Sequence, residues 1–260
     1  MEYKRIINNI FASNTEYLPF LQITATLSMV AFIVLVPQHL NMWLISIAVY
    51  AGIGCLGISI GYHRLLTHKS FKTSKFWERF CTLWGALAFT GSSIGWVGMH
   101  RDHHKYSDKP GDPHSPHVSG GKMLIAAYDY RPDKWKIRHL IFDTFHVFLH
   151  KWYFGLLLAW LAMWYIIGGV ESAMHMVIIP AVISIWISTT SNYMNHRWGY
   201  RNFETTDKSG NLWINAIFTF GEGWHNNHHA RPGNYDFGSG TSGKWWEFDP
   251  AARVIELIKR

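Results

Sequence analysis

The sequence is poor in charged residues and in cysteine. Asp, Glu, Lys and Arg together make up 16% of its 260 residues, well under the share of about a quarter that soluble domains usually carry. Cys55 and Cys81 stand in apolar stretches without a CxxC or similar spacing, so no disulfide framework or thiolate metal site is indicated. Hydrophobic residues reach 48% and aromatic residues 16%. This balance predicts a chain for which lipid forms part of the solvent.

Lysine and arginine are absent from four long apolar stretches, each able to cross a bilayer core of about 30 Å as a helix. We expect transmembrane helices at residues 18–37, 42–62, 152–168 and 174–195. The short connections at 37–41 and 168–173 make each neighbouring pair a hairpin. The fold class expected is an all-α membrane protein, with four transmembrane helices in two hairpins capped by a helical cytoplasmic domain.

The distribution of positive charge predicts the topology. The 24 Lys and Arg residues fall into three blocks, which are Lys4 with Arg5, 64–151 and 197–260. The positive-inside rule places all three blocks in the cytoplasm. The first apolar segment has no cleavage pattern and is expected to remain as a helix. We expect an integral multi-pass membrane protein, in a prokaryotic membrane rather than the endoplasmic reticulum.

A fifth apolar segment, residues 80–99, is diluted by glycine and serine. If it crossed the membrane, His100 would lie on the opposite side from His68. We therefore expect this segment as a helix inside the cytoplasmic domain or at the membrane interface. Residues 136–152 and 211–224 are expected as further interfacial helices.

Histidine is strongly over-represented: the chain carries 16, about three times the number in an average protein of this length. Nine of them fall into an HxxxxH pair, two HxxHH triplets and one NxxxH pattern, which are His63 and His68, His100, His103 and His104, His225, His228 and His229, and Asn192 with His196. Residues three or four apart share a helix face, so one HxxHH helix can reach two neighbouring ions. His63 and His68 are five apart and would diverge unless the helix ends between them, and they could then serve different ions.

The expected topology brings all nine histidines to one membrane surface. Chance produces one HxxHH motif in about one such sequence in twenty, and two in far fewer. A single structural zinc is a poor explanation, because zinc usually takes about four ligands in a closed tetrahedron. Nine imidazoles suit two ions of a metal that accepts five or six ligands and keeps an open position, with iron and oxygen as the leading case.

The order HxxxxH, HxxHH, HxxHH, with NxxxH before the last box, resembles the membrane fatty acyl desaturases of the stearoyl-CoA (delta-9) desaturase type, including bacterial and cyanobacterial enzymes. The resemblance covers residues 58–248. Further matching segments are Gly61–Arg64, Trp96, Ser107–Asp108, Asp112–His114, Gly221–His229 and Trp245–Trp246.

The resemblance implies a single fatty acid desaturase domain over residues 1–260, with its catalytic parts at 63–151 and 196–260. The reaction implied is oxygen-dependent desaturation of a fatty acyl chain at a di-iron centre, with two Fe(2+) ions as cofactor and O2 as co-substrate. The nine histidines are implied as iron ligands and Trp96 as a wall of the substrate tunnel. Asn192 is implied as a residue that surrounds the ligands or reaches the metal through a bridging water.

Imidazole ligands need their second ring nitrogen held by a carboxylate or carbonyl group. Asp102, Asp108, Asp112 and Glu222 are therefore expected to support the ligands from behind, with ordinary capping or surface charge as the equal alternative. His114, in the Asp-Pro-His segment that resembles the family, is expected to lie in the same surrounding layer.

The partners implied are a fatty acyl substrate, membrane lipid and an external electron donor. The chain has no flavin, nicotinamide or haem segment, so a ferredoxin or cytochrome b5 is expected to deliver electrons. The formal charge of +7 suits an acidic donor and suits anionic lipid equally well. The acyl group could be carried by lipid, coenzyme A or acyl carrier protein, and residues 126–131 differ from the coenzyme A-contacting stretch of the animal enzymes. No nucleic acid is expected.

Two other functions compete with delta-9 desaturation. The same iron site could hydroxylate a lipid or perform a related oxidation, which product analysis would reveal. A metal transporter would place polar ligands inside the bilayer, whereas these four stretches contain no carboxylate pair.

Overall fold

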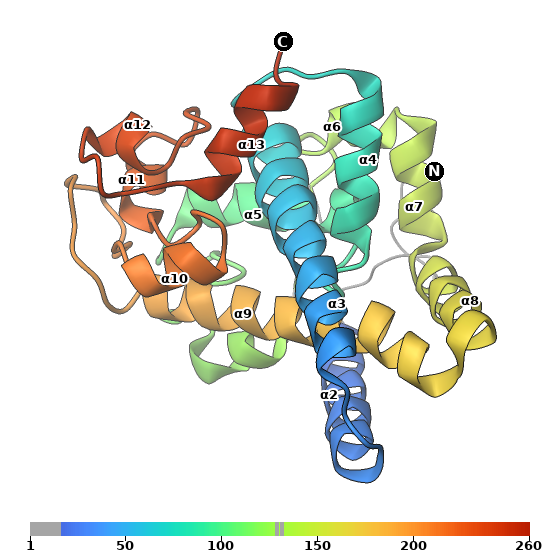
Figure 1. Cartoon of the computed structure of the whole chain (residues 1–260). Coiled ribbons are helices and arrows are strands. Elements are labelled where there is room, and N and C mark those ends of the chain that lie inside the picture. Colours follow the sequence, from blue (N-terminus) through green and yellow to red (C-terminus); the bar gives the residue numbers. More distant parts are fainter. Residues whose placement is uncertain (1–16, 128–129, 131–132) are drawn as a thin grey trace.

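The computed structural model describes residues 17–127, 130 and 133–260, and every regular element in this part of the chain is a helix (Figure 1). The described residues contain three isolated β-bridges and no strand. The all-α prediction is confirmed. The Lys4 and Arg5 block lies outside the described residues, as do residues 128, 129 and 131 of the 126–131 stretch.

Three helical runs are long and apolar enough to cross a membrane. The first is α2 (Leu18–Leu35), and the second joins α3 (Leu40–Ala51) to η2 (Gly52–Thr67). Figure 1 shows α2 and the start of α3 as a hairpin that extends away from the other helices. Its outward side chains are apolar and exposed, among them Phe20, Leu35 and Leu44. Such a surface is stable in lipid rather than in water.

The third run covers Tyr153–Asn195 and comprises α8 (Tyr153–Ala173), η4 (Met174–Ile178) and α9 (Ile179–Asn195). We expected two separate helices here, joined by a turn at 168–173. Helical geometry is interrupted within the run at Gly168 and Gly169, at the start of the expected turn, and Gly169 has a φ of +67°. Glycine tolerates this left-handed backbone because it has no Cβ.

The end of the second run is a π-helix, η2, rather than an α-helix. Its backbone bonds join residues five apart, and the His68 amide donates to the His63 carbonyl at 3.1 Å. In this geometry residues five apart share a face. The helix ends at Thr67, between His63 and His68, which is the case in which the two rings need not diverge. Their ring centroids are 4.8 Å apart.

The apolar segment 80–99 is divided between two helices, α4 (Lys75–Ala86) and α5 (Ser93–Tyr106). The break contains Phe89 and Gly91, both with positive φ, and the Ser92 hydroxyl caps α5 by accepting from the Gly95 amide. Helix α4 packs along η2, where a Cβ on Gly57 would lie 2.5 Å from the backbone nitrogen of Gly85. The segment is thus not one continuous span, and α5 continues beyond it into the first HxxHH motif.

The remaining helices are short. They are η3 (Gly120–Ile125), α6 (Arg138–Ile141), α7 (Thr144–Lys151), α10 (Trp213–Phe218), α11 (His225–Ala230), α12 (Ser239–Ser242) and α13 (Pro250–Ile258). The expected helix at 136–152 is broken at Phe142, and the one at 211–224 is reduced to α10. Asp143 and Asp249 set the starts of α7 and α13 by accepting backbone amide hydrogens.

Candidate metal centre

The nine histidines of the sequence motifs gather in two adjacent groups, each with its ligand nitrogens within 4.8 Å of one another. The first cluster is His63, His68, His100, His104 and His228, and the second cluster is His103, His196, His225 and His229. Both clusters are almost entirely buried. The structure therefore brings together every histidine that the four motifs contain.

Each HxxHH helix contributes to both clusters. On α5, His100 and His104 share one face and enter the first cluster, while His103 enters the second. On α11 the two histidines four residues apart, His225 and His229, enter the second cluster, and His228 enters the first. The stacked rings of His104 and His229, 4.5 Å apart, join the clusters.

The nitrogen spacing fits metal coordination. Nε2 atoms approach each other at 3.0 Å between His63 and His228 and at 2.9 Å between His196 and His225. Two nitrogens each about 2.1 Å from one ion, at right angles, lie about 3.0 Å apart. The buried Nε2 atoms of His68 and His229 have no hydrogen-bond partner among the described residues, which leaves their lone pairs for an ion.

The protonation states also suit ligation. Burial lowers the pKa of five cluster histidines well below its ordinary value, and neighbouring imidazoles lower it further; these are His68, His100, His104, His225 and His228. Burial lowers the pKa of His229 to about 4, although Asp207 opposes the shift. Neutral imidazoles offer a free electron pair, as metal binding requires.

Carboxylates hold several of the ligands from behind. Asp112 accepts from His103 Nδ1 at 3.0 Å and Asp108 accepts from His196 Nδ1 at 2.9 Å, while Glu222 contacts His63 Nδ1. Each contact fixes the tautomer and turns Nε2 toward its cluster. Burial by itself would raise the pKa of Asp112, but the hydrogen bond and charge of His103 lower it to about 2.

The fourth expected carboxylate does not belong to this layer. Asp102 contacts Lys136 and accepts from the Tyr130 hydroxyl at 2.8 Å, so it makes an ion pair at the surface of α5. The fourth carboxylate that supports a cluster histidine is instead Asp207, which the sequence did not indicate. Asp207 accepts from His229 Nδ1 at 3.0 Å. It lies in an irregular loop without a motif, and only its position in space reveals it.

Glu222 is tied to a second feature that the sequence analysis missed. The fully buried Arg64 donates to Glu222 at 3.1 Å and to Asp249 at 2.8 Å. A buried guanidinium is stable only when such anions surround it. This arrangement connects the end of η2 to the loop before α11 and to the start of α13.

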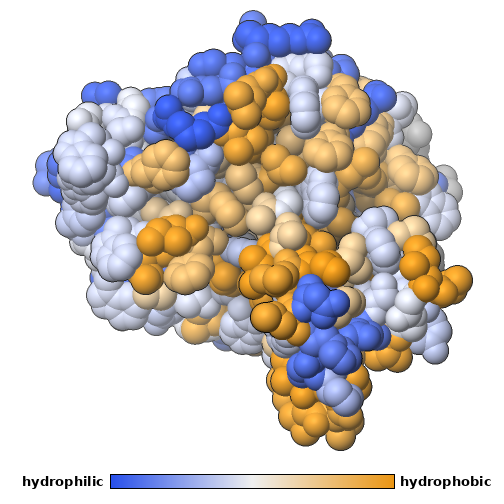
Figure 2. All heavy atoms as spheres, in the orientation of Figure 1, coloured by the Kyte–Doolittle hydropathy of each residue, from blue (hydrophilic) through white to orange (hydrophobic). Residues whose placement is uncertain are grey.

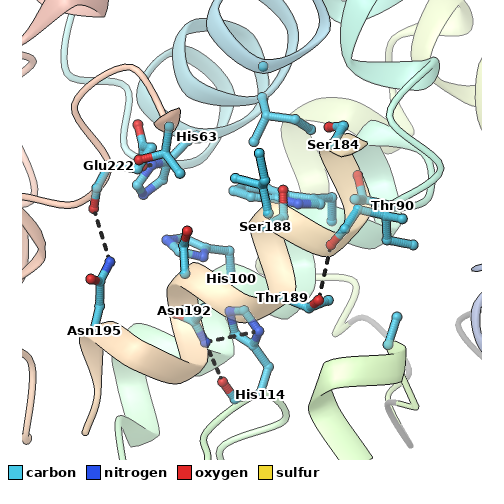
Figure 3. Close-up of a pocket in the computed structure, with 18 of the residues that line it drawn as sticks. His63, Thr90, His100, His114, Ser184, Ser188, Thr189, Asn192, Asn195 and Glu222 are labelled. Atoms are coloured by element: carbon cyan, nitrogen blue, oxygen red, sulfur yellow. Dashed lines mark hydrogen bonds and ion pairs between the residues drawn. The ribbon is translucent and has the colours of Figure 1, made fainter. Parts of the chain in front are cut away.

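A cavity adjoins the clusters and encloses about 880 Å³ of empty space, part of it open to solvent. Figure 3 shows His63 and Glu222 on one side of it and Thr90 on the other. Trp96 lines the cavity and stacks on His100, with centroids 4.8 Å apart.

Asn192 and His114 also line the cavity, and neither belongs to a cluster. The Asn192 amide donates to the His114 carbonyl at 2.8 Å, and the His114 ring lies 4.7 Å from that of His103. The two residues thus form the wall beside the second cluster. Among the other histidines, His146 and His150 bond to serines of α5, and His139 bonds to the Leu66 carbonyl.

The fold and site define a helical protein with membrane-spanning segments and two adjacent histidine clusters beside a buried cavity. A model of the fatty acid desaturase family matches residues 37–256. The chain therefore belongs to the fatty acid desaturase family, and the resemblance seen in its histidine motifs is confirmed. It is an oxidoreductase that desaturates fatty acyl chains.

Similar proteins are also named as desaturases of fatty acyl chains. An sn-1 stearoyl-lipid 9-desaturase of Anabaena variabilis is 33% identical, covering 88% of this chain and 85% of that protein. An sn-2 palmitoyl-lipid 9-desaturase of Nostoc sp. (strain 36) is 38% identical, covering 79% of this chain and 74% of its own length. An acyl-CoA C20 Delta5-desaturase of Anemone leveillei is 32% identical, and the match covers 84% of this chain and 71% of that protein.

Proposed function

We propose that this protein is a delta-9 acyl-lipid desaturase whose two histidine clusters each hold one iron ion. The observation that carries the proposal is the convergence of nine buried imidazoles into two adjacent groups with unpartnered nitrogens. The relatives named as 9-desaturases of lipid-bound chains support the position and the carrier. Oxygen, as co-substrate, would enter the same buried space.

The chain's own residues supply binding and orientation. Two iron ions with dioxygen provide the oxidising power to remove two hydrogens from a methylene pair, which no side chain can do. Trp96 forms a wall that fixes the acyl chain beside His100. Asp108, Asp112 and Glu222 hold the ligand rings, and Asn192 closes the side of the second cluster. Burial of these groups excludes water from the reacting chain.

For the membrane arrangement we propose four crossings with the metal centre on the cytoplasmic face. The break at Gly168 and Gly169 divides the third run into two helices. The lysine and arginine residues that the structure describes lie in 64–151 and 197–260, the two blocks that follow His63 and His196. A prokaryotic membrane is consistent with the cyanobacterial relatives. A separate ferredoxin or cytochrome b5 would deliver the two electrons per turnover.

The test removes one ligand from each cluster, as His104→Ala and His225→Ala, with His39→Ala as the control because His39 is exposed and far from both clusters in its contacts. Iron content is measured on the purified protein, and products are analysed by mass spectrometry with double-bond localisation. We expect less iron and no alkene in both variants, and a C9 double bond from the control. Full iron and activity in both variants, or a hydroxylated product without an alkene, would contradict the proposal.

A further inference from the structure

At one end of the cavity, the end of α3 contacts the end of α10 and the segment that follows it. From His63 the cavity continues along η2 past Ile58 and Gly54 to Tyr50. The Tyr50 hydroxyl donates to the Phe218 carbonyl, and the ring centroids of Tyr50 and Phe220 are 5.8 Å apart. Tyr50 lines the cavity at this end, and the Phe220 ring and the Phe218 carbonyl lie behind it.

The contact is tight and leaves little room for extra atoms. A Cβ on Gly54 would lie 2.8 Å from Cε2 of Phe220, so glycine is what lets the ring fit against the helix. Phe220 has a φ of +56°, a left-handed backbone that bulky residues rarely adopt. Such unusual backbone is concentrated at functional positions. The backbone of Phe220 thus fixes the position of its ring. Tyr50, on the other side of the contact, is held by a single hydrogen bond to the Phe218 carbonyl.

The outer side of this contact faces a hydrophobic surface. Trp213, Ile214, Ile217 and Phe218 of α10 are 41–58% exposed. Tyr50 belongs to the second membrane-spanning run, whose exposed side chains nearby include Ile47. Figure 2 shows hydrophobic surface over α10 and over the α2–α3 hairpin on the same face of the molecule. Lipid that surrounds the span would therefore also contact α10.

We propose that the contact of Tyr50 with Phe218 and Phe220 is a lateral portal, through which the acyl chain of a bilayer glycerolipid enters the cavity. The inference rests on the proposed function, because it concerns the substrate of that same site. An esterified chain keeps its headgroup at the membrane surface, so it reaches a buried site by sliding sideways out of the bilayer. The portal opens when Tyr50 releases the Phe218 carbonyl.

The experiment follows the chain rather than the reaction. Chelated, iron-free protein is placed in phosphatidylcholine vesicles containing a trace of phosphatidylcholine with a photoreactive diazirine near the methyl end of its sn-1 stearoyl chain. Brief illumination and peptide mass spectrometry give the labelling rate of the cavity wall around Ile58. Labelling of Ile47, which faces lipid, measures exposure to the probe.

Two variants change the portal in opposite directions. Tyr50→Phe removes only the hydrogen bond, and the loss of one hydrogen bond shifts an opening equilibrium by about two- to tenfold, so we expect cavity labelling to rise by that factor. Gly54→Ala adds a methyl group where the cavity passes Gly54, between Tyr50 and Ile58. It narrows the route to Ile58 and should reduce the labelling there. Tyr165→Phe, at an exposed tyrosine of α8, is the matched control and should label as the unchanged protein does.

Unchanged labelling in both Tyr50→Phe and Gly54→Ala would overturn the portal. The portal would also be overturned if Tyr50→Phe left cavity labelling unchanged but altered the preferred chain length of the substrate. Tyr50 would then line a closed end of the cavity. The labelling readout needs neither iron nor turnover, and only the comparison of chain lengths uses the active enzyme. A failure of the proposed chemistry would therefore appear as lost desaturation with portal labelling intact, and a failure of the portal as unaltered labelling in an active enzyme.

Discussion

Asp207 offers a sharp test of the metal centre, because no sequence motif marks it. One of its oxygens accepts from His229 Nδ1 at 3.0 Å, and the other accepts from the Ser209 amide at 2.9 Å and the Thr205 hydroxyl at 2.8 Å. Burial would raise the pKa of Asp207, but the hydrogen bonds and charge of His229, with Ser209, hold it well below its usual range. The group is a carboxylate at any physiological pH.

Asp207→Asn keeps the size of the side chain and reverses one contact. The loop bonds require the oxygen, so the new amide nitrogen faces His229 Nδ1 and can only donate. His229 must then carry its proton on Nε2, which removes that nitrogen as a ligand of the second cluster. Loss of such a supporting partner costs about 10- to 100-fold in metal affinity, which corresponds to about 1.4–2.7 kcal/mol at 1.36 kcal/mol per tenfold.

The assay is a chelator titration followed by metal analysis of the purified protein. We expect one of two bound ions to be lost at about 10- to 100-fold lower chelator concentration, with the other retained by the first cluster. Glu204→Gln, at an exposed carboxylate three residues away, is the control and should hold both ions. Equal retention of both ions in Asp207→Asn, or simultaneous loss of both, would refute the reasoning.

Three further predictions concern packing, pH and metal removal. Gly57→Ala should lower the melting temperature, because its Cβ would meet backbone of Gly85 and such overpacking costs about 1–3 kcal/mol; Gly121→Ala, which meets open space, should not. Burial lowers the pKa of His150 to about 4, so the unfolded chain binds more protons and stability should fall as pH drops from about 6.5 to 4. His150→Gln should flatten that decline in melting temperature, and an equal slope would count against it. Chelation should lower the melting temperature of the unchanged protein more than that of His104→Ala, and equal shifts would argue against metal-linked stability.

The histidine clusters could be predicted from the sequence because helical spacing is regular. The two HxxHH motifs have the same spacing on two helices, and the side chains three and four apart divide between two centres as that geometry requires. For His63 and His68 the α-helical spacing left the outcome open, because the two residues are five apart. The π-helical winding of η2 and its end at Thr67 bring the two rings together, and no motif in the sequence marks that winding.

Contacts from irregular segments were the least predictable. Asp108 and Asp112 follow α5 closely, so their nearness to its histidines was accessible from the sequence. Asp207 approaches His229 only because the loop between α9 and α10 returns to the site, and Asp102 is turned away toward Lys136. The glycines of segment 80–99 signalled a weak helix, yet only packing decided that the chain would bend at Phe89.

The charges around the clusters explain why buried carboxylates accompany neutral ligands. Nine neutral imidazoles add no charge, so two divalent ions would leave four positive charges in a buried volume, which is strongly unfavourable without counter-ions. Four carboxylates lie directly behind ligand rings, namely Asp108, Asp112, Asp207 and Glu222. Arg64 is balanced in turn by Asp249. With both ions bound, the charges of the site would therefore sum to zero. The charged groups lie around the clusters, and the cavity beside Trp96 stays suitable for an uncharged acyl chain.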